Sequence, residues 1–405
     1  MIKFEKTRII LTILAIAWGT FAIASMLAVG EGLKLTFAKA VAGAGHNLLV
    51  VVGGQTSQTY RGLPANRAIK LNKRDVEAIK ASVPNIALLS PEYDANKTMQ
   101  YQDQSIGTII KGVAPKYNII HAIDVKSDGR FISPLDIQTK TFVVVLGTKM
   151  VEQLFPDNAD PVGEHVLIGN RAFQVVGVME PKTQMFGSEG ADEYSNWIPY
   201  TTYELMYNPQ ELSSISIMCE NTHQIDLTKR QIQQVIALNH NANPNDDGIL
   251  TFTDVQQQQQ KINDFFFGMQ VFLGIIGALT LMVAGVGIAN VMFASISRAT
   301  HEIGIRMAVG ARTYQILKQY VIEALAVTFL GGVLGLLMSA LLVFGLRTIP
   351  MHGKLIDTIG QPHPVLSVSV VIVVVLVLGL VGFLAGFFPA LKASRVDPSE
   401  ALRYE

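Results

Sequence analysis

The sequence predicts an α+β membrane protein with four transmembrane helices and a large mixed α/β extracytoplasmic domain inserted between helices 1 and 2. Four long apolar runs divide the chain, strand-like and helix-like patterns fill the segment between the first two runs, and the basic residues gather on one side of the runs. The 405 residues are 49% hydrophobic and only 16% charged, and such a composition favours a membrane protein.

Each apolar run is long enough to cross a hydrocarbon core of about 30 Å, which needs about 20 residues. Transmembrane helix 1 is expected within residues 1–30, where the uncharged part is too long for the apolar region of a signal peptide. Helices 2, 3 and 4 are expected at 265–297, 321–346 and 365–391. The remaining segments are the outer domain at 31–264, a coupling loop at 298–320, a short external loop at 347–364 and a tail at 392–405.

Four spans place both ends of the chain on the same side of the membrane. The basic residues that flank the spans on that side are Lys3, Lys6, Arg8, Arg298, Arg306, Arg312, Lys318, Lys392, Arg395 and Arg403. Because cytoplasmic flanks carry the excess of positive charge, we expect both termini in the cytoplasm and the segment 31–264 outside it.

The outer segment alternates between strand and helix patterns. Branched and alternating residues predict strands at 47–52, 105–113, 142–146, 165–168, 172–179, 196–199 and 214–218. Helices are predicted at 72–82, 148–155, 201–206 and 225–238, with Asn72 and Thr201 as N-caps. This mixture predicts an α+β domain in two lobes, with a mobile polar loop at 181–194.

The two helices that border the outer domain are expected to continue beyond the membrane as adjacent stalks. Residues 31–43 extend helix 1, and residues 254–264 lead into helix 2. The second stretch contains five consecutive glutamines, Gln256 to Gln260, a composition that can indicate disorder. Glutamine is a good helix former and the flanks are helical, so we favour a stalk.

The coupling loop is a charged stretch between two apolar runs and contains Arg298, Glu302, Arg306, Arg312 and Lys318. Apolar positions recur along it at spacings of three and four, at Ile303, Met307, Gly310, Tyr314, Leu317 and Val321. This spacing predicts a helical stripe able to dock on a partner, with a bend at Gly310 because glycine is unfavourable inside a helix. The alternative is an ordinary charged connector whose basic residues only fix the topology.

The stretch from Glu302 to Ala311 (EIGIRMAVGA) resembles the connector of MacB/FtsX/LolC-type (type VII) ABC transporter permeases, and residues 389–402 resemble the closing signature of that family. Motifs in the outer segment resemble the MacB-type periplasmic core: Gly112–Pro115, Gly129–Phe131, Val145–Gly147, Leu154–Pro156, Asp160–Gly163 and Phe173–Val178. The resemblance is therefore to a MacB-like permease with a periplasmic core domain and no fused ATPase domain, over nearly the whole chain.

The resemblance implies that the connector contacts an ATPase subunit. The implied ATPase-coupling residues are Glu302, Ile303, Gly304, Ile305, Arg306, Met307, Ala308, Gly310, Ala311 and Glu323. It also implies a multi-pass protein of the bacterial inner (cytoplasmic) membrane, a homodimer or related heterodimer in membrane lipid, and a separate cytoplasmic ABC ATPase that binds ATP and Mg. Export members of the family further imply a periplasmic adaptor and an outer-membrane duct.

No catalytic machinery or cofactor site is visible in this sequence. The pair Gly353-Lys354 lacks the Ser or Thr that completes a P-loop. His301-Glu302 begins like a zinc-protease motif, but the second histidine is replaced by Ile305. The single Cys219 excludes an intrachain disulfide.

The interiors of the four runs lack Asp, Glu, Lys and Arg. A hydrophilic path needs polar groups at membrane depth, so we expect the spans to transmit force instead. The pairs Gly331/Gly335 and Gly382/Gly386 predict close helix packing within the subunit. The expected function is mechanotransmission, in which ATP hydrolysis by the partner drives export, efflux or extraction of a substrate from the periplasmic side.

Three alternatives remain open at this point. Within the family, the chain could be a lipoprotein-releasing permease subunit or a regulator of cell-wall hydrolases, although the latter usually has a much smaller outer domain. From another class, it could be a four-span membrane sensor or binding protein, which would leave the connector resemblance unexplained. The sequence does not name the substrate.

Overall fold

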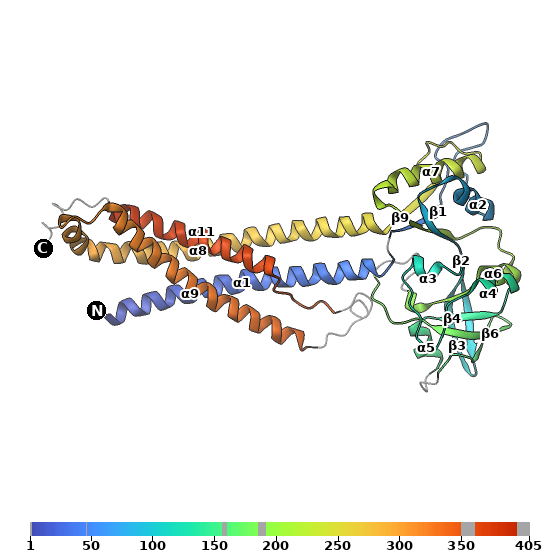
Figure 1. The fold of residues 1–405 in the computed structure, drawn as a ribbon, viewed down its shortest axis with the longest axis horizontal. Coiled ribbons are helices and arrows are strands. Elements are labelled where there is room, and N and C mark those ends of the chain that lie inside the picture. Colours follow the sequence, from blue (N-terminus) through green and yellow to red (C-terminus); the bar gives the residue numbers. More distant parts are fainter. Residues whose placement is uncertain (1, 46, 156–159, 185–191, 350–360, 395–405) are drawn as a thin grey trace. The chain divides into compact units, whose positions relative to one another are not determined.

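The computed structural model describes residues 2–45, 47–155, 160–184, 192–349 and 361–394. They form two compact units (Figure 1). The membrane unit contains the described residues of 1–36, 263–352 and 361–405, and the outer unit contains those of 37–262.

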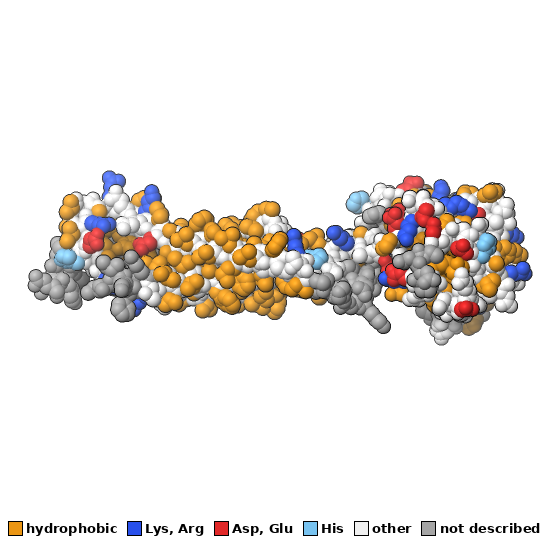
Figure 2. All heavy atoms as spheres, turned by 90° about the horizontal axis from the view of Figure 1, so that it is seen from below, with side chains coloured by type: hydrophobic (Ala, Val, Ile, Leu, Met, Phe, Trp, Pro, Cys, Tyr) orange, Lys and Arg blue, Asp and Glu red, His pale blue; other side chains and the backbone are white. Residues whose placement is uncertain are grey.

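Four helices of the described chain are long and apolar enough to cross a membrane, as predicted. They are α1 (Ile2–Ala42), α8 (Val255–Ala308), α9 (Thr313–Arg347) and α11 (Val368–Ala393). Figure 2 shows a hydrophobic band along these helices, with charged side chains gathered beyond it. The band is the surface that a hydrocarbon layer would cover.

Helix α8 is much longer than the span predicted at 265–297. Its 54 residues correspond to about 80 Å at 1.5 Å per residue, more than twice a hydrocarbon core of about 30 Å. The excess at its beginning includes Gln256 to Gln260, so this stretch is helical, as predicted, and not disordered. Helix α1 likewise continues to Ala42, so residues 31–42 are helical, as predicted.

The paired glycines allow the membrane helices to approach closely. A Cβ at Gly335 would lie 2.5 Å from the backbone oxygen of Ala17, so α9 contacts α1 at this point. A Cβ at Gly386 would lie 2.5 Å from that of Ala324, where α11 contacts α9. The predicted packing within the subunit is therefore confirmed.

The outer unit is a mixed α/β fold. Its strands are β1 (Leu48–Gly53), β2 (Ile86–Tyr101), β3 (Gln104–Val113), β4 (Val143–Leu146), β5 (His165–Ile168), β6 (Arg171–Val178), β7 (Ser195–Pro199), β8 (Ser214–Cys219) and β9 (Leu250–Asp254). Its α-helices are α2 (Lys73–Ser82), α3 (Tyr117–Ile120), α4 (Pro134–Thr139), α5 (Thr148–Leu154), α6 (Tyr200–Tyr207) and α7 (Ile225–Asn239), with 3₁₀ turns at Asp192–Tyr194 and Thr222–Gln224.

The strands form one sheet in the order β3-β7-β4-β6-β5-β2-β8-β1-β9, and an additional β2–β3 pairing closes the first six into a ring. Strand β2 is 16 residues long because it serves both parts. Its first half pairs with β8 up to Glu92, and its second half pairs with β3 from Glu92 onward. Instead of two separate lobes, the unit therefore has two sheet regions that share β2.

Most predicted elements are confirmed within one or two residues, including the Asn72 cap, whose side chain accepts a hydrogen bond from the Arg74 N–H. The prediction of a Thr201 cap is wrong, because α6 begins at Tyr200 and the Thr201 hydroxyl donates to the Ile137 carbonyl instead. Strands β2 and β9 and helices α3 and α4 were not predicted. Residues 185–191, half of the predicted loop at 181–194, lie outside the described residues, and Asp192–Tyr194 form a 3₁₀ turn.

Candidate functional site

The connector between the second and third membrane helices is a tight helical turn. Helix α8 continues to Ala308, and α9 begins at Thr313. Gly310 lies between them with φ +103°, a left-handed conformation that favours glycine. The predicted bend is confirmed, and the connector 298–320 is helical on both sides of it, as its period predicts, with only residues 309–312 outside the helices.

Four of the six residues of the predicted docking stripe pack into the protein's own core, whereas Gly310 and Tyr314 are exposed. Ile303 and Val321 are only 3% and 9% exposed, and both belong to the hydrophobic cluster of the membrane unit, with Met307 and Leu317 packed against them. The stripe is therefore wrong as a docking surface at these positions. A helical hairpin packs an apolar face against neighbouring helices of its own chain, and the apolar period of the connector reflects this internal packing.

A different apolar group is exposed at the connector. Ile305, Val309 and Tyr314 are 44%, 85% and 68% exposed, and they lie on both sides of the Gly310 turn. We call these three residues the connector patch. Val309 was not among the predicted coupling residues, and Tyr314 was assigned only to the stripe. An apolar residue directly before a turn glycine is the sequence signal that identifies Val309.

The other predicted coupling residues divide by exposure. Glu302, Arg306, Ala308, Gly310 and Glu323 are exposed, whereas Gly304 is buried and Ala311 is half-buried. The turn brings Glu302 to Ala311 into one short segment next to the start of α9, while Glu323 lies further along α9.

Arg306 connects the two helices of the connector. Its guanidinium forms an ion pair with Glu302, one turn earlier on α8, and donates to the Oε1 of Gln319 on α9 at 3.1 Å. Such an exposed pair contributes at most about 1 kcal/mol to stability. Its effect is to fix the orientation of α8 relative to α9 next to the connector patch.

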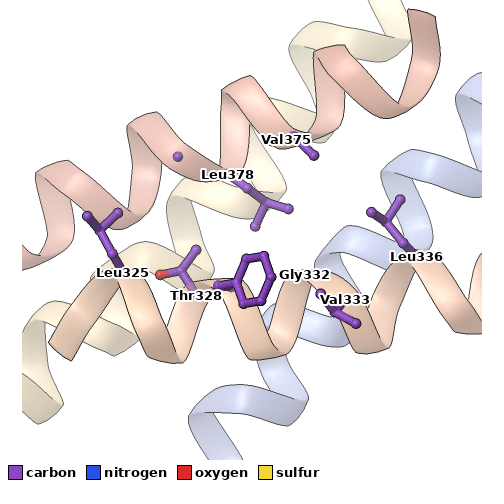
Figure 3. Close-up of a pocket in the computed structure, with 9 residues that line it drawn as sticks. Leu325, Thr328, Gly332, Val333, Leu336, Val375 and Leu378 are labelled. Carbon is purple, nitrogen blue, oxygen red and sulfur yellow. The ribbon is translucent and has the colours of Figure 1, made fainter. Parts of the chain in front are cut away.

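An apolar groove of about 250 Å³ lies between α9 and α11. Figure 3 shows the labelled residues around it: Leu325, Thr328, Gly332, Val333 and Leu336 from α9, and Val375 and Leu378 from α11. The Thr328 hydroxyl donates to the Ala324 carbonyl of its own helix at 2.8 Å, so it offers little to a polar solute. The groove fits a hydrocarbon group.

Comparison with known proteins links both units to one family. Residues 9–235 match the profile of the MacB-like periplasmic core domain, and residues 274–398 match that of the FtsX-like permease C-terminal region. The macrolide export ATP-binding/permease protein MacB of Azoarcus sp. (strain BH72) is 32% identical over 401 residues, which cover 98% of this chain and 57% of that protein. MacB of Escherichia coli (strain K12) is 30% identical over 411 residues, which cover 99% of this chain and 59% of that protein.

The chain thus spans about three fifths of the length of these relatives. Among solved structures, the periplasmic region of MacB from Actinobacillus actinomycetemcomitans has a TM-score of 0.44 at 16% identity, covering 55% of this chain and 95% of that one. The extracellular domain of the ABC-type transporter YknZ has a TM-score of 0.43 at 18% identity, covering 51% of this chain and 100% of that one.

Proposed function

Because the chain belongs to the family of MacB-like ABC transporter permeases, we propose that it is the membrane subunit on which a cytoplasmic ABC ATPase acts. The ATPase binds the connector patch, and its nucleotide cycle displaces α8 and α1, whose stalks move the outer unit. The substrate is handled on the outer side of the membrane. The conformational element is a rigid helix pair biased by the state of a partner.

The continuity of α8 is the observation that carries this proposal. Its first residue, Val255, is buried against Leu48 and Val50 of β1 in the outer unit, and near its other end Ile303 is buried in the membrane unit. One uninterrupted helix therefore has a fixed contact at each end. We propose that a displacement at the connector is transmitted along this helix to the outer unit.

The polar side chains inside the membrane unit favour force transmission rather than a hydrophilic path for the substrate. Its buried polar side chains include Thr20 and Thr328, whose hydroxyls each donate at 2.8 Å to a carbonyl of their own helix. Ser339 accepts a hydrogen bond from Ser25 at 3.1 Å. These hydroxyls are hydrogen-bonded within the unit, either to a carbonyl of their own helix or to each other, whereas a pore would require polar groups facing a water-filled cavity.

Several finer features belong to the same proposal. The distribution of Lys and Arg supports cytoplasmic termini and a periplasmic outer unit in the inner membrane. In this proposal an ABC ATPase partner binds ATP and Mg, and the permease residues take up the movement; the Gly353-Lys354 pair lacks the following Ser or Thr that a P-loop needs. The permease works as a homodimer or related heterodimer, with an adaptor and an outer-membrane duct where the substrate is exported.

The docking step is tested with Val309→Asp, which places a charge in the connector patch at a position already 85% exposed. The free chain should keep its stability, whereas burying the carboxylate against the ATPase should weaken binding by a factor of about ten or more, or about 1.4 kcal/mol. Binding is measured by copurification and by titrating the ATPase onto the chain held in nanodiscs. Met307→Asp is unsuitable because Met307 packs inside the membrane unit.

Leu227→Asp is the matched control, since Leu227 is 55% exposed on α7 of the outer unit. It should leave ATPase binding unchanged. Full ATPase binding by a Val309→Asp, Tyr314→Asp double variant would contradict the docking assignment. It would favour a four-span sensor that acts through its outer unit alone.

A further inference from the structure

A short non-helical segment, residues 361–367, lies against α1 in the membrane unit and leads into α11 (Figure 1). We call these residues the clamp segment. Its backbone contacts α1 at two positions one helical turn apart. The Val365 N–H donates to the Ala28 carbonyl at 2.9 Å. The His363 carbonyl lies over Gly32, where a Cβ would be only 2.1 Å from that oxygen, so this approach requires glycine.

The hydrogen bond to Ala28 is an addition to the ordinary pattern of a helix. Within a helix, each carbonyl accepts from the N–H four residues later, and its second lone pair usually stays free. Ala28 is fully buried, and its carbonyl also accepts from Val365. Non-helical backbone next to hydrocarbon is tolerated only where its polar groups find partners in the protein. The contact with α1 therefore satisfies a donor that the clamp segment itself cannot satisfy.

The clamp segment is also attached to α9 and α11. The Arg347 Nε, at the end of α9, donates to the Pro364 carbonyl at 3.4 Å. The Ser367 hydroxyl caps α11 by accepting from the Val370 N–H at 3.3 Å. Pro364 is buried, and Leu366 packs against the hydrophobic cluster of the membrane unit. The clamp segment therefore belongs to the α9–α11 pair and contacts α1 from it.

Helix α8 contacts α1 at the same level, but through side chains. The Glu31 Oε2 accepts from the Gln270 amide at 2.6 Å. A Cβ at Gly30 would lie 3.5 Å from the terminal carbon of Met269 and 3.6 Å from a methyl group of Leu273. Long side chains can follow a small movement of α1 by changing rotamer. The backbone contacts of the clamp segment cannot adjust in this way.

We propose that the clamp segment holds α1 to α9 and α11 at Ala28 and Gly32, so that α1 tilts about this level and does not slide along its neighbours. This inference rests on the proposed function, in which the ATPase cycle supplies the movement. Sliding by part of a turn would break the hydrogen bond from Val365 and bring a residue with a Cβ against the His363 carbonyl. Tilting keeps both contacts at the axis of rotation.

The movement is measured by pulsed EPR between spin labels on cysteines, in a Cys219→Ser chain that is bound to its ATPase in nanodiscs and diluted with unlabelled chain. Val29→Cys with Phe344→Cys is the clamp pair, since these positions are 42% and 71% exposed. Lys39→Cys with Phe344→Cys is the stalk pair, and Lys39 is exposed. ATP should shift the stalk-pair distance by more than about 2 Å and the clamp-pair distance by less, since helices at interfaces commonly adjust by about 1–2 Å.

Gly32→Ala places a methyl group against the His363 carbonyl and should release α1 from the clamp segment. The clamp pair should then show a broader distance distribution without nucleotide, and ATP should shift it as it shifts the stalk pair. Gly30→Ala is the matched control, two residues away on the same helix. Its Cβ meets only the side-chain ends of Met269 and Leu273, so both label pairs should behave as in the wild type.

Val365→Pro is the second variant, because it removes the N–H that donates to Ala28 and leaves α1 unchanged. It should act like Gly32→Ala, and it decides the matter if Gly32→Ala does not fold. Equal ATP-dependent shifts of both pairs in the wild type, or wild-type distances in both variants, would overturn the proposal. Failure of the ATPase coupling gives a different result, in which neither pair shifts with ATP in the wild type. Broadening of the clamp pair in Val365→Pro without nucleotide would then still support the clamp.

Discussion

The two units bury polar groups in different ways. In the membrane unit the buried hydroxyls of Thr20 and Thr328 donate to carbonyls of their own helices. Contacts between these helices are mainly apolar and are close at glycines, where a Cβ would clash with the neighbouring helix. In the outer unit the buried Glu92 and Lys111 join strands β2 and β3 through a charged hydrogen bond. Apolar contacts tolerate small shifts, whereas charged hydrogen bonds fix direction. The difference suits helices that move and an outer unit that keeps its shape.

The strongest way to break this comparison is to remove one charge of the buried pair. Lys111→Met leaves Glu92 and Asp94 buried without their cation, which should destabilise the outer unit by about 3–5 kcal/mol. Unfolding is followed through the fluorescence of Trp197, fully buried in the outer unit, in a Trp18→Phe background.

Lys70→Met is the control for Lys111→Met. Lys70 lies 3.3 Å from Glu211, and both side chains are more than 45% exposed, so the loss should stay below about 1 kcal/mol. Equal effects of the two substitutions would mean that the buried pair does not hold the sheet regions together.

The outer unit should lose stability as the pH falls, while the membrane unit should not. Burial lowers the pKa of His121 from 6.5 to about 4, and the pKa of Glu92 falls from 4.5 to about 2 because its cation and hydrogen bonds outweigh burial. Both groups bind fewer protons when folded than when unfolded. The free energy of unfolding therefore decreases from pH 6.5 to 4 through His121 and from pH 4.5 to 2 through Glu92.

The pH dependence is measured from the unfolding midpoint of the Trp197 signal at several pH values. His121→Asn should remove the part between pH 6.5 and 4, and His223→Asn, on an exposed turn, should not. An unfolding midpoint that stays constant down to pH 4 in the wild-type chain would contradict this prediction.

A smaller effect is expected from the packing of the membrane helices. Gly335→Ala introduces a Cβ 2.5 Å from the Ala17 backbone oxygen, so α9 must move away from α1, at a cost of about 1–3 kcal/mol. Gly287→Ala, on α8, meets nothing within 4 Å and should be neutral or slightly stabilising. Thermal unfolding in one detergent compares the two variants, and equal stability would show that close helix approach at Gly335 is not required.

The sequence predicted the elements whose pattern depends only on local chemistry. The four apolar runs were predicted from their hydropathy alone, and the strand His165–Ile168 was predicted from its alternation of side chains. Strand β2 was missed because Pro91, Glu92 and Asp94 interrupt its pattern. These polar residues are tolerated only because β3 and β8 meet at Glu92 and supply its partners, which no local window contains.

The candidate site was predicted in position but not in orientation. The period of the connector correctly placed Ile303 and Val321 on one face, but it carries no information about whether a partner or the chain itself covers that face. The buried pair of Glu92 and Lys111 was not predicted for a similar reason. Its two residues become neighbours through the pairing of β2 with β3, and β2 itself was not predicted.

The smallest effect on stability, and the sharpest distinction between the two kinds of ion pair, is expected at Arg306. Unlike Lys111, it is 49% exposed in its side chain, so its pair with Glu302 should add no more than about 1 kcal/mol. Arg306→Lys keeps the charge but loses the planar fork that reaches Glu302 and Gln319 together. If Arg306 positions the connector, the variant should unfold like the wild type and bind the ATPase with unchanged affinity, yet stimulate ATP hydrolysis several-fold less.

Lys318→Arg, in the exposed first turns of α9, is the control and should leave stability, ATPase binding and ATPase stimulation unchanged. A parallel loss of binding would instead make Arg306 part of the docking surface, and unchanged stimulation would show that the orientation of α8 relative to α9 does not depend on this side chain.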